Sequence, residues 1–146
     1  MPGQDAASSL ILHATTVALS DRGVLILGPS GSGKSSLALS LLALGCCLIS
    51  DDQTLLRKDG TGLSASCPNP DLQGVIEARG IGLLKLSSQP SVTLSLVVDM
   101  GRAETERLPP QRCEQILQMP LPLVLGAQNP HLAQAILLLL RGGRLA

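Results

Sequence analysis

The sequence predicts a single α/β domain in which a β-strand, a glycine-rich loop and an α-helix follow one another early in the chain. Residues 24–27 are apolar and read as a strand, whereas residues 28–33 are rich in glycine and cannot continue it. Residues 34–44 carry apolar side chains at helical spacing and end at Gly45. A chain of 146 residues suits one hydrophobic core, so we expect one domain.

The remaining elements follow from apolar alternation and from the positions of Gly and Pro. Before the loop we expect a strand at 11–19 that contains His13, with a turn at 20–23. After the loop and its helix we expect strands at 47–50, 54–65 (two strands with a turn), 94–98 and 121–125. We also expect a helix that Pro109 and Pro110 open and that runs to about Met119, and a closing helix from Pro130. We assign residues 1–9 to a flexible amino terminus and residues 10–146 to the domain.

Composition limits both the core and the ligands. Hydrophobic residues make up 45% of the chain, yet it contains no Phe, Tyr or Trp. Aliphatic side chains must therefore fill the core, and a bound base cannot stack on an aromatic ring. The 11 basic residues balance the 11 acidic ones, so no global field favours nucleic acid or an anionic membrane. We expect neither as a partner.

Cysteine spacing and apolar runs indicate no zinc site, export signal or membrane span. The 4 cysteines form no CxxC pair and no zinc-like set with histidine, so we expect idle or buried thiols. Residues 1–9 are small and polar, which predicts a cytoplasmic protein. The apolar run at 135–140 is far shorter than the roughly 20 residues that a membrane-spanning helix needs.

Residues 28–35 match the phosphate-binding pattern G-x-x-x-x-G-K-[ST] at every fixed position. Glycines let the backbone curl until several N–H groups point at one phosphate, and the following helix adds the positive end of its dipole. Lys34 would bridge the outer phosphates and Ser35 would coordinate Mg²⁺. The loop therefore predicts that ATP and Mg²⁺ are bound, with nucleotide contacts from Gly28, Pro29, Ser30, Gly31, Ser32, Gly33, Lys34, Ser35 and Ser36.

The loop does not identify the phosphate acceptor, and two placements of the acidic residues stay open. In an ordinary P-loop hydrolase the magnesium-side Asp follows an apolar strand, as Asp99 does here. Alternatively, Asp51 and Asp52 at the end of the strand at 47–50 face the phosphates, with Glu77 as a further acid. Sequence spacing does not choose between these two placements.

Four separated elements of the chain resemble the catalytic domain of bacterial HPr kinase/phosphorylase. They are His13, GPSGSGKSS at 28–36, ISDD at 49–52 and IEARGIG at 76–82, with ERL at 106–108 as a weaker fifth. The resemblance covers roughly residues 10–140, and the joint order of these elements is more specific than the loop alone. It implies a fold like the nucleotide-binding core of phosphoenolpyruvate carboxykinase, and not a RecA-like sheet.

The same resemblance implies an activity. Family members phosphorylate a serine of HPr, a small phosphocarrier protein of the phosphotransferase system, form hexamers, and can remove the phosphate again with inorganic phosphate. A serine hydroxyl is a poor nucleophile, so a carboxylate must accept its proton, and the family pattern points to Asp52. By resemblance the catalytic residues are Asp52, Asp51, His13, Lys34 and Arg107, and the metal ligands are Ser35 and Glu77.

The chain departs from the family pattern in places. Longer members carry a separate amino-terminal domain, whereas a dozen residues precede His13 here, so we expect a truncated form. The basic loop associated with phosphorylase activity reads QNPH at 128–131, without its arginine. Two other functions stay open: a nucleotide-binding regulatory module without phosphoryl transfer, and a P-loop kinase or hydrolase of a small metabolite that uses Asp99.

Overall fold

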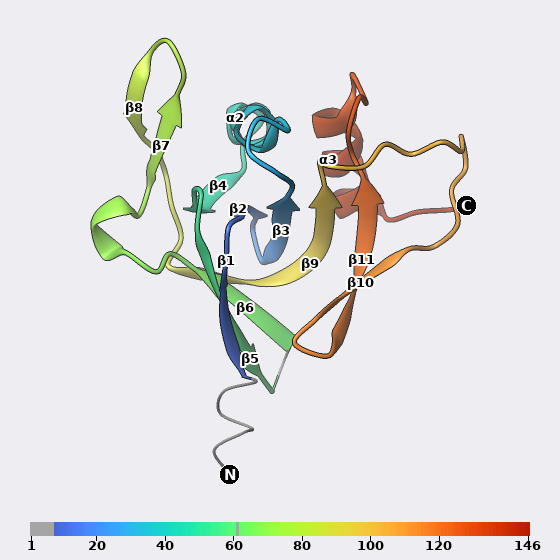
Figure 1. The fold of residues 1–146 in the computed structure, drawn as a ribbon, viewed down its shortest axis with the longest axis horizontal. Coiled ribbons are helices and arrows are strands. Elements are labelled where there is room, and N and C mark those ends of the chain that lie inside the picture. Colours follow the sequence, from blue (N-terminus) through green and yellow to red (C-terminus); the bar gives the residue numbers. More distant parts are fainter. Residues whose placement is uncertain (1–7, 61) are drawn as a thin grey trace.

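The computed structural model describes residues 8–60 and 62–146, which form a curled β-sheet with two helices packed on one face (Figure 1). The helices are α2 (Lys34–Ala43) and α3 (Leu132–Gly142), and a short 3₁₀ turn, η1, spans Pro70–Leu72. The strands are β1 (Ser9–Leu12), β2 (Thr15–Leu19), β3 (Arg22–Leu27), β4 (Cys47–Ser50), β5 (Thr54–Asp59), β6 (Gly62–Ser66), β7 (Val75–Ala78), β8 (Gly82–Lys85), β9 (Ser91–Asp99), β10 (Cys113–Ile116) and β11 (Met119–Leu125).

The long strand β9 joins the two halves of the main sheet. Its first residues pair antiparallel with β6, and its second half runs parallel to both β3 and β11. The strand order is β1-β5-β6-β9-β3-β2-β4, with β11 added beside β9 and β10 beside β11. Because β9 serves both halves, it bends along its length and the sheet curls with it (Figure 1). Strands β7 and β8 form a separate hairpin that projects from the body.

Aliphatic side chains fill the core on both faces of the sheet, as the composition predicts. On β3, Val24 and Ile26 pack with Leu41 of α2 and Ile136 of α3, whereas Leu25 belongs to a cluster on the opposite face. That second cluster draws on the curled part of the sheet, and its largest fully buried members include Leu25, Ile49, Leu56, Leu63 and Val97. The α/β fold class is confirmed, and so are the predicted helices at the loop and at the carboxyl end.

The helix predicted from Pro110 to Met119 is wrong. Residues 113–116 form strand β10, which pairs antiparallel with β11, and Leu117 and Gln118 make the tight turn with φ values of 50° and 67°. Ile116 is buried in the same cluster as Leu121. Pairing with β11 and this burial outweigh the helix-start signal of the proline pair, as tertiary context commonly outweighs local propensity.

The single strand predicted at 11–19 is also wrong, because the chain changes partners at His13. Strand β1 pairs with β5, whereas β2 pairs with β3 and β4, so residues 13 and 14 connect two parts of the sheet. Of the predicted flexible terminus, residues 1–7 lie outside the described residues, and Ser9 begins β1. Within the described chain, no helix is long and apolar enough to cross a membrane.

The close approach between β3 and β9 at Gly23 can be tested by substitution. A Cβ atom on Gly23 would lie 2.9 Å from the backbone oxygen of Thr93 and 2.6 Å from a methyl carbon of Val92. We expect Gly23→Ala to lower the free energy of unfolding by about 1–3 kcal/mol, measured by denaturant titration, because the neighbouring backbone must shift. Gly142→Ala is the control, because that Cβ meets nothing within 4 Å. Equal stability of the two variants would contradict the close approach.

Candidate active site

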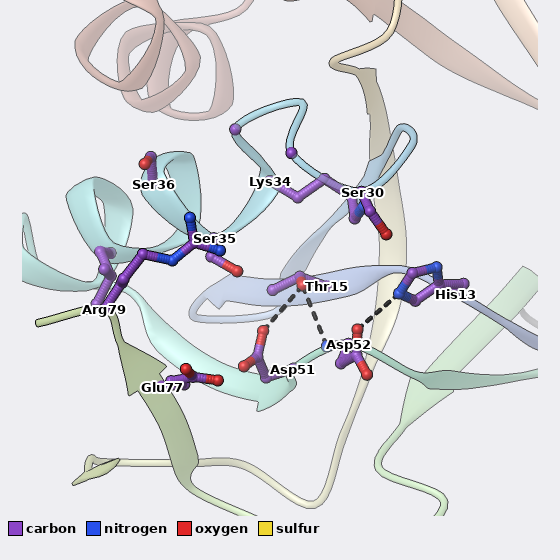
Figure 2. Close-up of a pocket in the computed structure, with 13 residues that line it drawn as sticks. His13, Thr15, Ser30, Lys34, Ser35, Ser36, Asp51, Asp52, Glu77 and Arg79 are labelled. Carbon is purple, nitrogen blue, oxygen red and sulfur yellow. Dashed lines mark hydrogen bonds and ion pairs between the residues drawn. The ribbon is translucent and has the colours of Figure 1, made fainter. Parts of the chain in front are cut away.

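A cavity of about 470 Å³ opens between the loop after β3, the ends of β2 and β4, and the β7–β8 hairpin (Figure 2). Its volume lies in the range of about 300–1,000 Å³ that is usual for small-molecule sites. The residues that line it come from segments far apart in the sequence, including His13, Lys34, Asp51 and Glu77. The fold therefore gathers most of the predicted site residues in one place.

The loop at 28–33 has a backbone that requires glycine. Gly28, Gly31 and Gly33 have φ values of 146°, 80° and 100°, in the region that favours glycine. A Cβ atom on Gly28 would lie only 2.5 Å from the hydroxyl oxygen of Ser32. That hydroxyl is buried and finds no hydrogen-bond partner among the described residues, which is a cost of the tight curl. Ser30, Gly31 and Gly33 line the cavity directly, whereas Gly28, Pro29 and Ser32 shape the loop behind them.

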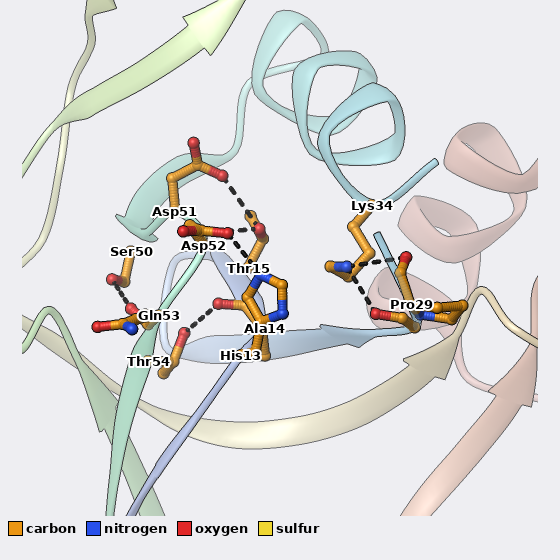
Figure 3. A network of polar contacts seen from close by, with 11 residues as sticks. His13, Ala14, Thr15, Pro29, Lys34, Ser50, Asp51, Asp52, Gln53 and Thr54 are labelled. Carbon is orange, nitrogen blue, oxygen red and sulfur yellow. Dashed lines mark hydrogen bonds and ion pairs between the residues drawn. The ribbon is translucent and has the colours of Figure 1, made fainter. Parts of the chain in front are cut away.

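Lys34 begins α2 and lies against the loop. Its ammonium donates hydrogen bonds to the backbone oxygens of Gly28 at 2.6 Å and Pro29 at 3.1 Å (Figure 3). The next two residues, Ser35 and Ser36, present exposed side chains to the cavity from the first turn of the helix. A helix amino terminus carries partial positive charge. The loop, the ammonium and the helix terminus thus concentrate positive charge in one part of the cavity, as a phosphate site requires.

Asp51 and Asp52 follow β4 and differ in their surroundings. Asp51 is half-buried, and its carboxylate accepts a hydrogen bond from Thr15 Oγ1 at 3.0 Å. Burial raises the pKa of the Asp51 carboxyl above its ordinary value, and the negative charge of Asp52 acts in the same direction. The hydrogen bonds from the Thr15 side chain and from the backbone at Glu77 oppose these effects. The pKa of Asp51 is therefore raised overall.

Asp52 turns toward solvent and toward His13. Its φ of 70° is uncommon for a residue other than glycine, and its backbone N–H donates to Thr15 Oγ1 at 3.2 Å. Its carboxylate lies 2.6 Å from Nε2 of His13, and 74% of the side chain is exposed. Thr15 therefore contacts the carboxylate of Asp51 and the backbone N–H of Asp52, and the two carboxylates point in different directions (Figure 3). Sequence reasoning missed Thr15, because threonine is common in strands and gives no separate signal.

Hydrogen bonds around the acid pair hold this arrangement in place. The hydroxyl of Ser50 donates to the backbone oxygen of Gln53, closing the turn that carries the two aspartates. Thr54, at the start of β5, donates to the backbone oxygen of Ala14 at 2.9 Å. Its hydroxyl also bonds with that of Thr16 at 2.9 Å. The hydrogen bonds of Ser50 and Thr54 thus hold the segment with His13 beside the turn with Asp52 (Figure 3).

Glu77 and Arg79 reach the cavity from the β7–β8 hairpin (Figure 2). Within the described residues, no group of three or more His, Cys, Asp or Glu side chains has the geometry to hold a metal ion by itself. Mg²⁺ does not need such a group, because it is commonly bound by one or two carboxylates together with phosphate oxygens and water. The hydroxyl of Ser35 and the carboxylate of Glu77 line the same cavity and fit this requirement.

Asp99 and Arg107 lie apart from these residues. Asp99 ends β9 beside the loop, but its carboxylate accepts hydrogen bonds from the backbone N–H of Gly101 and from Nε of Arg102, each at 2.8 Å. Arg107 is exposed in the segment after β9. Neither residue is among the described residues that line the cavity. The predicted role of Arg107 stays a prediction.

Comparison with known proteins identifies the family. The family model described as HPr serine kinase C-terminal domain matches residues 4–119. An HPr kinase/phosphorylase of Bordetella petrii is 36% identical over 132 residues, covering 82% of this chain and 42% of that protein. One of Verminephrobacter eiseniae is 33% identical over 148 residues, covering 88% of this chain and 46% of that protein. The chain thus spans less than half the length of these relatives.

A solved structure agrees with these sequence matches. The HPr(Ser) kinase/phosphatase from Coxiella burnetii superimposes with a TM-score of 0.76 and 28% sequence identity, over 90% of this chain and 88% of that one. The resemblance found in the loop, the acid pair and the ExRGxG segment is therefore confirmed, and the chain belongs to the HPr serine kinase C-terminal domain family.

Proposed function

We propose that this chain is an ATP-dependent kinase domain that phosphorylates a serine of an HPr-like phosphocarrier protein. The observation that carries the proposal is the contact of 2.6 Å between Asp52 and His13 beside the phosphate-binding loop. It supplies an accessible carboxylate next to the loop, as transfer to a hydroxyl requires. The names of the relatives, HPr kinase/phosphorylase, support the choice of acceptor.

The loop and the start of α2 would hold the phosphates of ATP. Backbone N–H groups of the loop would bind the β-phosphate, and the ammonium of Lys34 would exchange the loop carbonyls for the outer phosphate oxygens. Its four-carbon stem permits that movement. Mg²⁺, held by Ser35 and Glu77, would neutralise charge on the β- and γ-phosphates. Together these groups would orient the γ-phosphate toward an incoming hydroxyl.

Asp52 would accept the proton of the serine hydroxyl. The serine oxygen forms a bond to the γ-phosphorus while the bond from that phosphorus to the β–γ bridging oxygen breaks, and the hydroxyl proton passes to the carboxylate. His13 steadies that carboxylate through their hydrogen bond. In removal of the phosphate by inorganic phosphate, an oxygen of inorganic phosphate would bond to the phosphoserine phosphorus while the bond from that phosphorus to the serine oxygen breaks. Pyrophosphate would be released, and the protonated Asp52 would return its proton to the serine oxygen.

Asp52 fits the role of base better than Asp51 does. The Asp51 carboxylate is half-buried and engaged by the Thr15 hydroxyl, whereas most of the Asp52 side chain is open to an arriving acceptor. The rival metabolite hydrolase would use Asp99, whose carboxylate is engaged by Gly101 and Arg102. The homo-oligomer and the cytoplasmic location stay predictions.

The proposal is tested by incubating the chain with ATP, Mg²⁺ and HPr and locating phosphate by mass spectrometry. We expect one phosphoserine on HPr. Asp52→Asn should keep nucleotide affinity but slow single-turnover transfer by about 100-fold or more, the scale of lost general-base catalysis. Asp99→Asn should have a much smaller effect. If Asp99→Asn slows transfer more than Asp52→Asn does, the site follows the Asp99 arrangement. If the chain binds ATP but transfers phosphate to no acceptor, it acts as the regulatory module instead.

The metal role of Glu77 is tested by titrating transfer rate against Mg²⁺. Glu77→Gln keeps the size of the side chain but removes its charge, so we expect the half-saturating Mg²⁺ concentration to rise by about tenfold or more. Excess Mg²⁺ should restore part of the rate. Glu114→Gln removes a carboxylate outside the cavity and should leave the titration unchanged. Superimposable curves for wild type and Glu77→Gln would remove Glu77 from the metal site.

The buried position of Asp51 predicts a cost in stability that depends on pH. Because folding raises the pKa of Asp51, the folded protein holds this proton more readily than the unfolded chain, and stability falls as pH rises above the unfolded pKa of about 3.9. We expect Asp51→Asn to raise the melting temperature at pH 7, with the gain shrinking toward pH 3. Asp21→Asn controls for net charge. A gain of the same size at both pH values would contradict the assignment.

A further inference from the structure

The cavity has two chemically different ends. Figure 2 shows His13 and Asp52 at one end and Arg79 at the other, with the side chain of Ser35 between them. The first end carries the proton acceptor of the proposed reaction. The second end is formed by Arg79 from the β7–β8 turn together with Ser36 and Leu39 of α2. The proposed reaction assigns no role to Arg79 or Leu39 at this second end.

The proposed reaction fixes the direction of a bound nucleotide. The γ-phosphate would lie next to the proton acceptor, at the end with Asp52 and His13, and Ser35 would help to hold the metal that neutralises charge on the phosphates. The α-phosphate and the nucleoside follow in the opposite direction along the triphosphate. They therefore leave the loop on the side of Arg79 and Leu39 (Figure 2).

The side chains at this end suit a nucleobase in a chain without aromatic rings. Arg79 makes no side-chain hydrogen bond or ion pair within residues 8–60 and 62–146, so its guanidinium is free to meet a ligand. A guanidinium is planar and stacks on π systems, which a lysine ammonium does less well. Leu39 is half-buried and adds an apolar surface. A flat cation and an aliphatic side chain can together cover the base where no Phe, Tyr or Trp exists.

We propose that Arg79 and Leu39 form a nucleoside subsite, in which the guanidinium stacks on the base. The inference rests on the proposed use of a nucleoside triphosphate and adds where its nucleoside lies. The described residues that line the cavity include no Asn or Gln, the side chains that most readily read the edge of an adenine. The subsite therefore holds the base by its face and discriminates little between adenine and guanine.

Binding calorimetry with Mg²⁺ separates the nucleoside from the phosphates. The ligands are ATP and inorganic tripolyphosphate, which carries the three phosphates without a nucleoside. For Arg79→Ala we expect ATP affinity to fall roughly three- to tenfold, the range of a cation–π contact, while tripolyphosphate affinity stays unchanged. Arg22→Ala removes an equal charge at the end of β3 that lies away from the loop, and it should change the affinity for neither ligand. Wild type should bind ATP and GTP within about threefold of each other.

Several outcomes would overturn the subsite. Equal losses for ATP and tripolyphosphate would make Arg79 a phosphate ligand, and no loss for either would remove it from the site. A preference for ATP over GTP greater than about tenfold would show that the base edge is read. Leu39→Ala, checked for folding by its melting temperature, should also lower the affinity for ATP and leave that for tripolyphosphate unchanged. An unchanged affinity for ATP with a lower affinity for tripolyphosphate would exclude Leu39 from the subsite. If Arg79→Ala behaves as expected but wild type never phosphorylates HPr, the proposed function fails and the subsite stands.

Discussion

The parallel pairing of β3 with β9 is the constraint on which the rest of the structure depends. Leu25, Ile26 and Leu27 of β3 align with Val97, Val98 and Asp99, and the next backbone N–H, that of Met100, donates to the oxygen of Leu27. Both strands are buried on both faces here, so a slip by one residue would exchange the side chains that pack on the helices for those that pack in the opposite cluster. This register fixes the point at which β3 ends. The glycine loop begins there, and α2 follows from it.

The second half of the site depends on β2, which pairs with both β3 and β4. Strand β2 brings Thr15 beside the end of β4, where a single hydroxyl contacts both Asp51 and Asp52. Through β3 the same strand is registered to the phosphate loop. The spacing between the loop and the acid pair is therefore set by buried backbone pairing, and not by flexible side chains. Such rigid support is what a transfer site needs, because small displacements of reacting groups are costly.

Local patterns were sufficient to predict the loop and α2, because each depends on residue types at fixed spacing, whereas the preference for the acid pair over Asp99 came from the family resemblance. They were not sufficient for residues 113–119, where pairing with β11 decided the structure. They also could not show that His13 lies where the chain changes partners, which is what lets its ring reach Asp52, 39 residues away. Thr15 and Arg79 become candidates only once the cavity is known, because a threonine in a strand and an arginine in a turn are both common and give no signal of a site.

The charges in the cavity explain why nucleotide and metal should bind together. Its described lining contains three carboxylates, those of Asp51, Asp52 and Glu77, together with the cations of Lys34 and Arg79. A triphosphate arriving alone would add several negative charges to this set, and the repulsion would offset much of the attraction of the loop. A divalent cation between the phosphates and Glu77 would reverse that balance. Each ligand would then raise the affinity for the other by the same factor, because coupling between two bound ligands is reciprocal. The Asp51 carboxylate, whose burial costs stability, thus belongs to the set of charges that would make the proposed transfer conditional on the metal.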